Sequence, residues 1–398
     1  MILSIRRNRL IRTNPVRKPF PRALLRFERL EAREVPSTGI EDVASLPDLP
    51  GMGTDYPTVY TLEELAAQSG APVGGGPIRE QRRQRFVVGT GPGERSTVNV
   101  YDSATNALIG ILTPYGKDAT CGVRVAVGDV NGDGVQDIIT APGAGHSPLV
   151  KVFDGKTFAE IRSFLAFEET FTGGVFVAAG DVLGSGQADV VVGAGVDGGP
   201  RVRVFAATDI APTGEVHAAV EPYSRRDFFA YENDFRGGVS VAVADINGDG
   251  FADIVAGAGP GGGPRVLVVS GKDDTQLANF FAYDSSLRSG ISVSAGVLTV
   301  GAPASFVTVP MNGGGPDVHL FSLATGAKPI AAFAPFADGH YGNGVVIRDL
   351  TGDGRGDLIL TNGPGTKPRV IVLDAELGMK LRDFPAFMPD YLGGLYVA

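Results

Sequence analysis

Tryptophan is absent from this 398-residue chain, cysteine occurs once and histidine only four times. Because Cys121 is alone, an intramolecular disulfide framework is excluded, and another interaction must hold an extracellular fold together. No apolar run approaches the ~18–20 residues that a membrane span requires. The histidines form no pair at metal-ligand spacing, and no acid/base set can be identified. These absences favour a protein that is not an enzyme.

Charge is unevenly distributed along the chain. The net charge is −9, but Met1–Ser37 contains ten Arg or Lys against three acidic residues, so the remainder carries −16. A globular part this acidic repels nucleic acid phosphates and attracts cations. We interpret residues 1–37 as a basic leader and residues 38–84, rich in Pro and Gly, as a linker. Within the linker, the capping box Thr61-Leu-Glu-Glu64 predicts one short helix.

Glycine is abundant, with 57 residues, and from Arg85 to Ala398 it marks a repeat. A glycine followed by mostly apolar residues recurs at Gly122, Gly174, Gly238, Gly290, Gly344 and Gly394, at steps of 52, 64, 52, 54 and 50 residues. The long step contains an insertion at about residues 206–226, which we place in a loop.

Three further strand signals follow within most periods. They are an apolar run such as Asp137–Ile139, a period-2 strand after a Gly/Pro turn such as Pro200–Phe205, and an aromatic strand such as Phe228–Tyr231. Four strands per ~50 residues, repeated around an axis, are typical of a β-propeller. The sequence therefore predicts an all-β propeller with four-stranded blades over residues 85–398.

The two ends of the repeat region complement one another. The region opens at Arg85–Gly91, which matches the second strand of a blade, and it stops at Gly394–Ala398, which matches a first strand. We therefore expect the C-terminal strand to join the N-terminal blade and close a ring of six blades, which removes two exposed edges. The alternative is seven blades, with residues 38–84 supplying a divergent one.

An Asp-rich loop between the first and second strands is the most informative motif. Oxygen side chains at loop positions 1, 3, 5 and 9, with a sharp turn at a position-6 glycine and the carbonyl of position 7, make the hard oxygen cage that Ca²⁺ prefers. One such match could be an Asp-Gly turn, but the motif recurs at one point of three repeats. The candidate ligands are Asp129, Asn131, Asp133, the Val135 carbonyl and Asp137 in the second blade; Asp245, Asn247, Asp249, the Phe251 carbonyl and Asp253 in the fourth; and Asp349, Thr351, Asp353, the Arg355 carbonyl and Asp357 in the sixth.

The other loops depart from this pattern. In the third blade Leu183 and Ser185 replace two oxygen-rich positions, so we expect that loop to hold calcium very weakly or not at all. The fifth blade has no carboxylate there, which predicts two to three calcium ions in all. The tripeptide Arg355-Gly356-Asp357 is not interpreted as an adhesion motif, because Asp357 is position 9 of a loop.

These motifs resemble FG-GAP repeats, the integrin α-chain-like or VCBS-type repeats, over roughly residues 85–398. The resemblance implies a propeller with structural Ca²⁺ loops on one face and binding surfaces on the other. It also implies seven blades more often than the six counted here. Separately, Arg26–Ser37 is similar to a box near the start of large secreted or surface bacterial proteins.

The leading functional hypothesis is a secreted or cell-surface bacterial binding or adhesion scaffold with structural calcium, and without enzymatic activity. Its expected partner is a protein or glycan at the cell surface, not nucleic acid. One alternative is a lectin, against which the lack of tryptophan counts, because flat aromatic platforms usually stack on sugars. Another is a polysaccharide lyase or hydrolase built on a propeller. The oligomeric state is not predicted.

Overall fold

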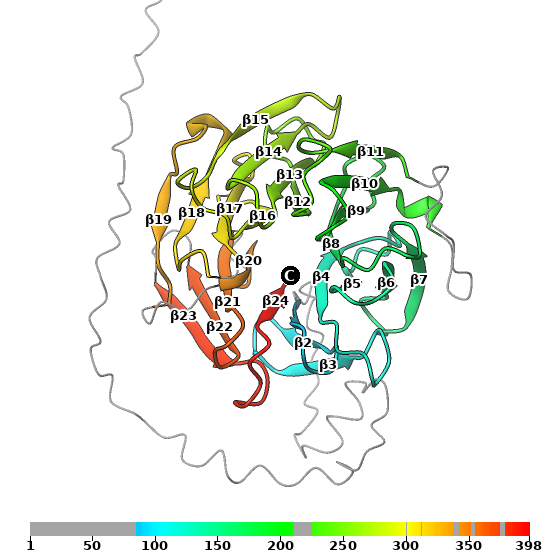
Figure 1. Ribbon diagram of the computed structural model, residues 1–398. Helices are drawn as coiled ribbons and strands as arrows, with labels where there is room; N and C mark the ends of the chain where they lie inside the picture. The colour runs from blue at the N-terminus through cyan, green and yellow to red at the C-terminus, as the bar shows by residue number, and fades with distance from the viewer. Residues whose placement is uncertain are drawn as a thin grey trace, which may run out of the picture.

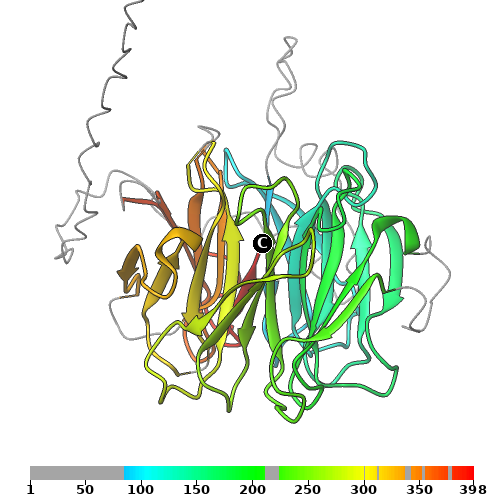
Figure 2. The same cartoon turned by 90° about the horizontal axis from the view of Figure 1, so that it is seen from above.

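The computed structural model describes residues 85–210, 224–299, 301–311, 313–336, 342–351, 355–374 and 379–398. The predicted leader at 1–37 and the linker at 38–84, with its short helix, lie outside these residues. The described chain forms six four-stranded antiparallel sheets arranged around a central axis (Figure 1). Seen from the side, the strands run between the two faces of the ring (Figure 2). The predicted six-bladed all-β propeller is therefore confirmed.

In each blade the first strand lies innermost and the other three follow outward. Blade one contains β24 (Leu395–Val397), β1 (Arg85–Thr90), β2 (Val98–Asp102) and β3 (Leu108–Leu112). Blade two contains β4 (Val123–Gly128), β5 (Asp137–Pro142), β6 (Leu149–Phe153) and β7 (Glu160–Leu165). Blade three contains β8 (Val175–Gly180), β9 (Asp189–Ala194), β10 (Arg201–Phe205) and β11 (Arg226–Phe229).

The second half of the ring repeats this order. Blade four contains β12 (Val239–Ala244), β13 (Asp253–Ala258), β14 (Arg265–Val269) and β15 (Gln276–Phe281). Blade five contains β16 (Ile291–Gly296), β17 (Ser305–Pro310), β18 (Val318–Phe321) and β19 (Ala331–Phe333). Blade six contains β20 (Gly342–Arg348), β21 (Asp357–Asn362), β22 (Arg369–Asp374) and β23 (Lys380–Pro385).

The ring is closed by the last strand of the chain, as the two ends of the repeat region predicted. Strand β24 pairs antiparallel with β1, with Val397 opposite Val88 and Leu395 opposite Thr90. Two further backbone hydrogen bonds, at 2.8 and 3.0 Å, join Ala398 to Val87. Blade one is thus built from both ends of the propeller. Pairing with β24 covers the inner edge of β1, which would otherwise be unpaired.

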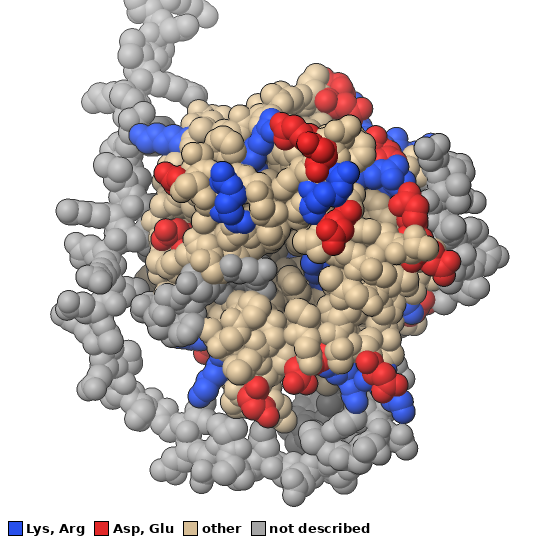
Figure 3. Space-filling model, viewed as in Figure 1, with Lys and Arg blue, Asp and Glu red and all other residues tan. Residues whose placement is uncertain are grey.

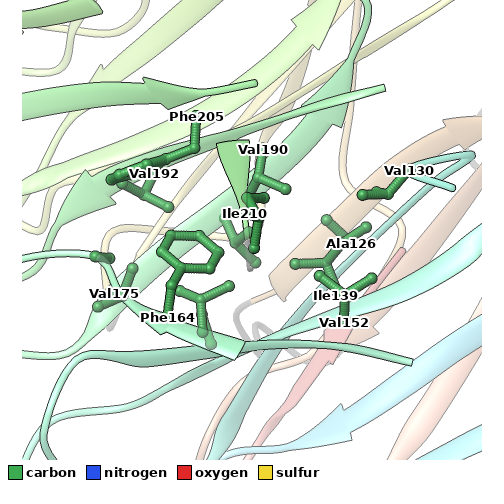
Figure 4. Packing of buried hydrophobic residues seen from close by; sticks show 14 of the residues in the cluster. Ala126, Val130, Ile139, Val152, Phe164, Val175, Val190, Val192, Phe205 and Ile210 are labelled. Atoms are coloured by element: carbon green, nitrogen blue, oxygen red, sulfur yellow. The ribbon is translucent and has the colours of Figure 1, made fainter. Parts of the chain in front are cut away.

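The hydrophobic core consists of layers between neighbouring blades. Between blades two and three, Ile139 and Phe164 from one blade face Val175, Val192 and Phe205 from the next (Figure 4). Similar clusters of buried aliphatic and aromatic side chains lie between the other blades. Because each sheet is buried on both faces, its central strands contain apolar runs, such as the three valines after Asp189 in the fully buried β9.

Two details of the strands differ from the sequence-based expectations. The aromatic motif ends the fourth strand and does not form its centre, because β11 stops at Phe229 and Tyr231 lies beyond it. In blade six, Arg348 pairs with Asp357 as Gly128 pairs with Asp137, so the glycine that begins the repeat is Gly342 and not Gly344. The step from Gly290 is then 52 residues, like most of the others.

The single cysteine, Cys121, is half-buried, and its Sγ lies 3.4 Å from Ser96 Oγ. The expected insertion loop begins with the short 3₁₀ helix η2 (Ala207–Asp209), and its last predicted residue, Arg226, already belongs to β11. A second such helix, η4 (Leu323–Thr325), follows β18. Within the described ranges, no helix is long and apolar enough to cross a membrane.

Candidate metal centre and central channel

The Asp-rich loop of blade two connects β4 to β5 and is organised by its first carboxylate. Asp129 Oδ1 accepts the N–H groups of Gly132 and Asp133 at 2.8 and 3.0 Å, and Oδ2 accepts that of Gly134 at 2.8 Å. Gly132 and Gly134 have φ values of +76° and +82°, a backbone region in which residues with a Cβ are strained. The hydrogen bonds to Asp129 therefore all come from residues of the loop itself.

Blade four repeats this geometry. Asp245 accepts the N–H groups of Gly248, Asp249 and Gly250 at 2.7, 3.1 and 2.9 Å. The Asn247 side-chain oxygen accepts the Asp249 N–H at 2.9 Å, a distance that the Asn131 loop also shows. Two loops more than a hundred residues apart thus share the N–H groups that bond positions 1 and 3, although Asn131 Nδ2 donates to Asp137 and Asp154 and Asn247 Nδ2 donates to Asp249.

The ninth position of each loop is a buried carboxylate. Asp137 and Asp253 are 0% exposed, and Asp357 is 3% exposed. The Asp137 carboxylate accepts the Val130 N–H at 3.0 Å and, from the turn after β6, the Gly155 N–H at 2.9 Å. Burial raises the pKa of Asp137 to about 6, although these N–H donors oppose the shift. Position nine therefore ties the loop to its own blade.

The third and sixth loops show only part of this hydrogen-bond pattern. In the third, Asp181 accepts the Ser185 and Gly186 N–H groups at 2.7 and 2.8 Å, as expected for the turn. Asp189 Oδ1 is buried and has no hydrogen-bond partner among the described residues. In the sixth, Asp353 lies outside the described residues, while Asp349, Thr351 and Arg355 lie within them. Buried Asp357 accepts the Leu350 N–H at 2.9 Å, so the Arg-Gly-Asp tripeptide does not expose its carboxylate.

The candidate ligand atoms of the second and fourth loops are of the chemical type that calcium binds. Every candidate ligand is a hard oxygen. Oδ1 of Asp129 and of Asp245 accepts two N–H groups, whereas Oδ2 of each accepts one and keeps a second lone pair. Across the described part of the chain, no three His, Cys, Asp or Glu side chains form a metal-holding group. Each candidate set contains three aspartates, and among the described residues the three aspartates of a loop are not gathered into one such group. Calcium stays a prediction.

A lysine distinguishes the second loop from the fourth. Lys156 Nζ lies 2.9 Å from Asp133 Oδ2, and this contact lowers the pKa of Asp133. The equivalent Lys272 lies over the ring of Phe251, with Nζ 5.5 Å from the ring centroid. An ammonium group on Asp133 competes with any cation there, whereas Asp249 has no such ion pair among the described residues.

The central channel was not found by sequence reasoning. The innermost strands β4, β8, β12, β16, β20 and β24 surround a cavity of about 280 Å³. Figure 3 shows the hollow near the centre of one face, with Lys and Arg (blue) and Asp and Glu (red) scattered over the surface around it. Arg124 and Arg348 are the only charged side chains among the described lining residues.

The two arginines differ in their surroundings. Arg124 Nη1 donates to the Val175 carbonyl of the next blade at 3.1 Å, and its guanidinium lies 3.9 Å from the Phe176 ring centroid. Arg348 has no hydrogen bond or ion pair with any described residue. Burial lowers the pKa of Arg348 to about 10, which leaves the group protonated at neutral pH.

Comparisons with known proteins agree with the repeat. The sequence model of the FG-GAP repeat matches residues 122–157 and 237–275. Integrin alpha-V of Gallus gallus is 29% identical over 158 residues, which are 36% of this chain and 14% of that protein. The chain thus spans a small part of the length of this relative.

Among solved structures, the Dos1 propeller shares 13% identity with a TM-score of 0.40, covering 74% of this chain and 65% of that one. The exotype rhamnogalacturonan lyase YesX shares 14% identity with a TM-score of 0.38, covering 74% and 58%. The two matched FG-GAP segments fall on blades two and four, and each contains a complete Asp-rich loop. This chain is a six-bladed β-propeller that contains FG-GAP repeats, similar in sequence to part of an integrin α chain.

Proposed function

We propose that this protein is a non-enzymatic binding scaffold, secreted or at the cell surface, whose propeller is stabilised by calcium in the loops of blades two, four and six. The observation that carries the proposal is the matched loop geometry of blades two and four, at the same point of two FG-GAP repeats. The similarity to an integrin α chain supports an extracellular setting and a protein ligand.

Calcium would act on stability and not on chemistry. A cation that binds only the folded state contributes RT ln(1 + [L]/Kd), about 2.7 kcal/mol for a site at ~100 times Kd. Such sites suit an extracellular propeller that lacks disulfides. The fourth loop is the expected strongest site, because Asp249 does not share its carboxylate with the lysine that contacts Asp133 in the second.

The first test is thermal unfolding with calcium and with a chelator, for the wild type and for Asp249→Asn. Asparagine keeps the side-chain oxygen that accepts the Phe251 N–H at 3.0 Å, but removes the charge that a calcium ion needs. We expect calcium to raise the melting temperature of the wild type, and the rise to be smaller in Asp249→Asn. The two proteins should unfold at similar temperatures in the chelator.

Ser185→Ala is the matched control, because it changes the same loop position in blade three, where calcium is not expected. Its response to calcium should equal that of the wild type. An unchanged melting temperature on chelation of the wild type would remove calcium from the proposal.

The binding role needs a separate measurement. Arrays of extracellular proteins and of glycans, probed with the calcium-loaded protein, should give saturable binding to a protein ligand. Binding confined to glycans would identify a lectin. Release of unsaturated sugars from polysaccharides would identify a lyase and contradict the scaffold.

A further inference from the structure

Arg348 is a cation in an unusual place. It ends β20, the innermost strand of blade six, and it lines the axial cavity. Here a level means one position along the axis that all innermost strands share. At the level of Arg348, the last residues of the innermost strands of blades two to five are Gly128, Gly180, Ala244 and Gly296. No other side chain of that level is larger than a methyl group, and no ion pair joins Arg348 to a described residue, although Asp129, Asp181, Asp245 and Asp349 directly follow this level at the start of the Asp-rich loops.

The glycines of this level are explained by packing. A Cβ on Gly180 would meet Val243 at 2.6 Å, and one on Gly296 would lie 2.7 Å from the Ile347 carbonyl oxygen. The small residues therefore serve the close approach of neighbouring blades. Arg348 is the exception at this level, and no contact with a described residue accounts for it.

A second hydrogen-bond donor, a serine hydroxyl with no partner among the described residues, lies on the adjacent blade. Ser294 is two residues before Gly296 on β16, so it faces the same channel about 7 Å further along the axis. Its side chain is 6% exposed, and its hydroxyl has no hydrogen bond to any described residue. By contrast, Ser240, at another level of the same channel, donates to the Ile291 carbonyl at 2.8 Å.

The cavity therefore combines a protonated guanidinium with no acidic side chain among its described lining residues, in a protein whose net charge is −9. Arg348 is half-buried at the cavity wall, and an oxyanion supplies what a guanidinium requires, because its planar fork of N–H donors matches two oxygen atoms. We propose that the channel binds a small oxyanion, held by the Arg348 guanidinium with the Ser294 hydroxyl as an additional donor.

This site does not depend on the ligand of the scaffold, but it adjoins the sixth calcium loop, because Arg348 directly precedes the candidate ligand Asp349. The class of ligand is a sulfate, phosphate or carboxylate group small enough for a cavity of about 280 Å³. Arg124, towards the other end of the strands, is not part of the site, because its guanidinium already bonds the Val175 carbonyl and packs on Phe176.

The test is isothermal titration calorimetry of the full chain with sulfate and, in parallel, with acetate, against chloride at matched ionic strength. Comparing sulfate with acetate distinguishes a site for a tetrahedral oxyanion from a site for a carboxylate. We expect saturable binding of at least one of them, and a loss of affinity of about tenfold or more in Arg348→Gln, as for removal of a charge-assisted hydrogen-bond donor. Ser294→Ala should lose less. The control Arg95→Gln, which makes the same charge change at an exposed site, should bind like the wild type.

Thermal unfolding gives a second measurement that does not depend on the titration. Without the oxyanion, Arg348→Gln should melt no lower than the wild type, because it removes an unpaired charge from the channel. With the oxyanion, the wild type should gain stability and Arg348→Gln should not. If neither anion binds the wild type, or if Arg348→Gln binds as well as Arg95→Gln does, the proposal is wrong.

Discussion

Equivalent aspartates at position nine of the loops differ in how well the fold accommodates their charge. Asp137 accepts hydrogen bonds on both oxygens, including one from Gly155 after the third strand. Asp189, at the same place in blade three, accepts the Leu183 N–H at 2.8 Å on Oδ2, while its buried Oδ1 has no partner among the described residues. Burial, with the nearby charge of Asp181, raises the pKa of Asp189, although the N–H groups of Leu183, Val182 and Ala207 act to lower it.

This difference predicts a pH-dependent effect of Asp189→Asn. A carboxyl group whose pKa is raised on folding binds its proton more tightly in the folded state. Its contribution to stability therefore falls as pH rises from the ordinary aspartate pKa through the raised one, and stays low above it. Asparagine cannot ionise, so we expect the variant to gain stability relative to the wild type at neutral pH, by about 1–3 kcal/mol, and much less in acid.

Melting temperatures of both proteins at neutral and acidic pH check this. Asp197→Asn is the control, because Asp197 is exposed and has a φ of +68°, which asparagine also adopts. An equal difference between Asp189→Asn and the wild type at both pH values would show that the charge of Asp189 is not the cause.

Close backbone approach explains another repeated residue. A Cβ on Gly259 would lie 1.9 Å from the Gly237 carbonyl oxygen, and the Gly259 N–H donates to the Gly238 carbonyl at 3.0 Å. We expect Gly259→Ala to lower the free energy of unfolding by about 3 kcal/mol or more, since the clash is with backbone. Gly261→Ala, with nothing within 4 Å of its Cβ and a φ of +89°, should cost only about 1–2 kcal/mol. Urea denaturation measures both, and similar costs would contradict the steric explanation.

At the scale of elements, the aromatic residue beyond each fourth strand joins one blade to the next. The hydroxyl of Tyr231, which follows β11 of blade three, shares its one proton between the Ala256 and Arg265 carbonyls of blade four, at 2.8 and 2.9 Å. Tyr283 of blade four bonds the Thr308 carbonyl of blade five at 2.7 Å. The corresponding Phe167 has no hydroxyl and packs under the guanidinium of Arg203. The ring is therefore the shared feature, and the hydroxyl is an addition.

Two substitutions of Tyr231 separate these contributions. Tyr231→Phe should lower the free energy of unfolding by about 0.5–1.5 kcal/mol, the net value of a hydrogen bond. Tyr231→Ala should cost about 3–5 kcal/mol, because it also leaves a cavity between blades. Chemical denaturation followed by circular dichroism measures both values. Equal costs would place the interaction in the hydroxyl and not in the ring.

At the scale of the whole molecule, a short strand completes the ring. Leu395 and Val397 of β24 are 0% and 8% exposed and belong to the cluster between blades six and one. Deletion of Leu395–Ala398 should leave the inner edge of β1 unpaired, lower the melting temperature and increase cleavage by protease in blade one. A synthetic peptide of residues 390–398 added to the shortened protein should restore part of the loss. A shortened protein that melts like the full chain would contradict closure by β24.

The sequence by itself determined the architecture, because blade architecture is a local and repeated property. Strand patterns and loop motifs can be read from residues that are close in sequence. So can the second-strand pattern of Arg85–Gly91 and the first-strand pattern of Gly394–Ala398, which complete one blade. The tertiary structure alone decided what meets across blades: Tyr231 on Ala256, and Arg348 in a channel without an acidic side chain among its described lining residues. Such contacts join residues of separate repeats, and their meeting depends on how far each blade turns about the axis, which no periodicity in the sequence records.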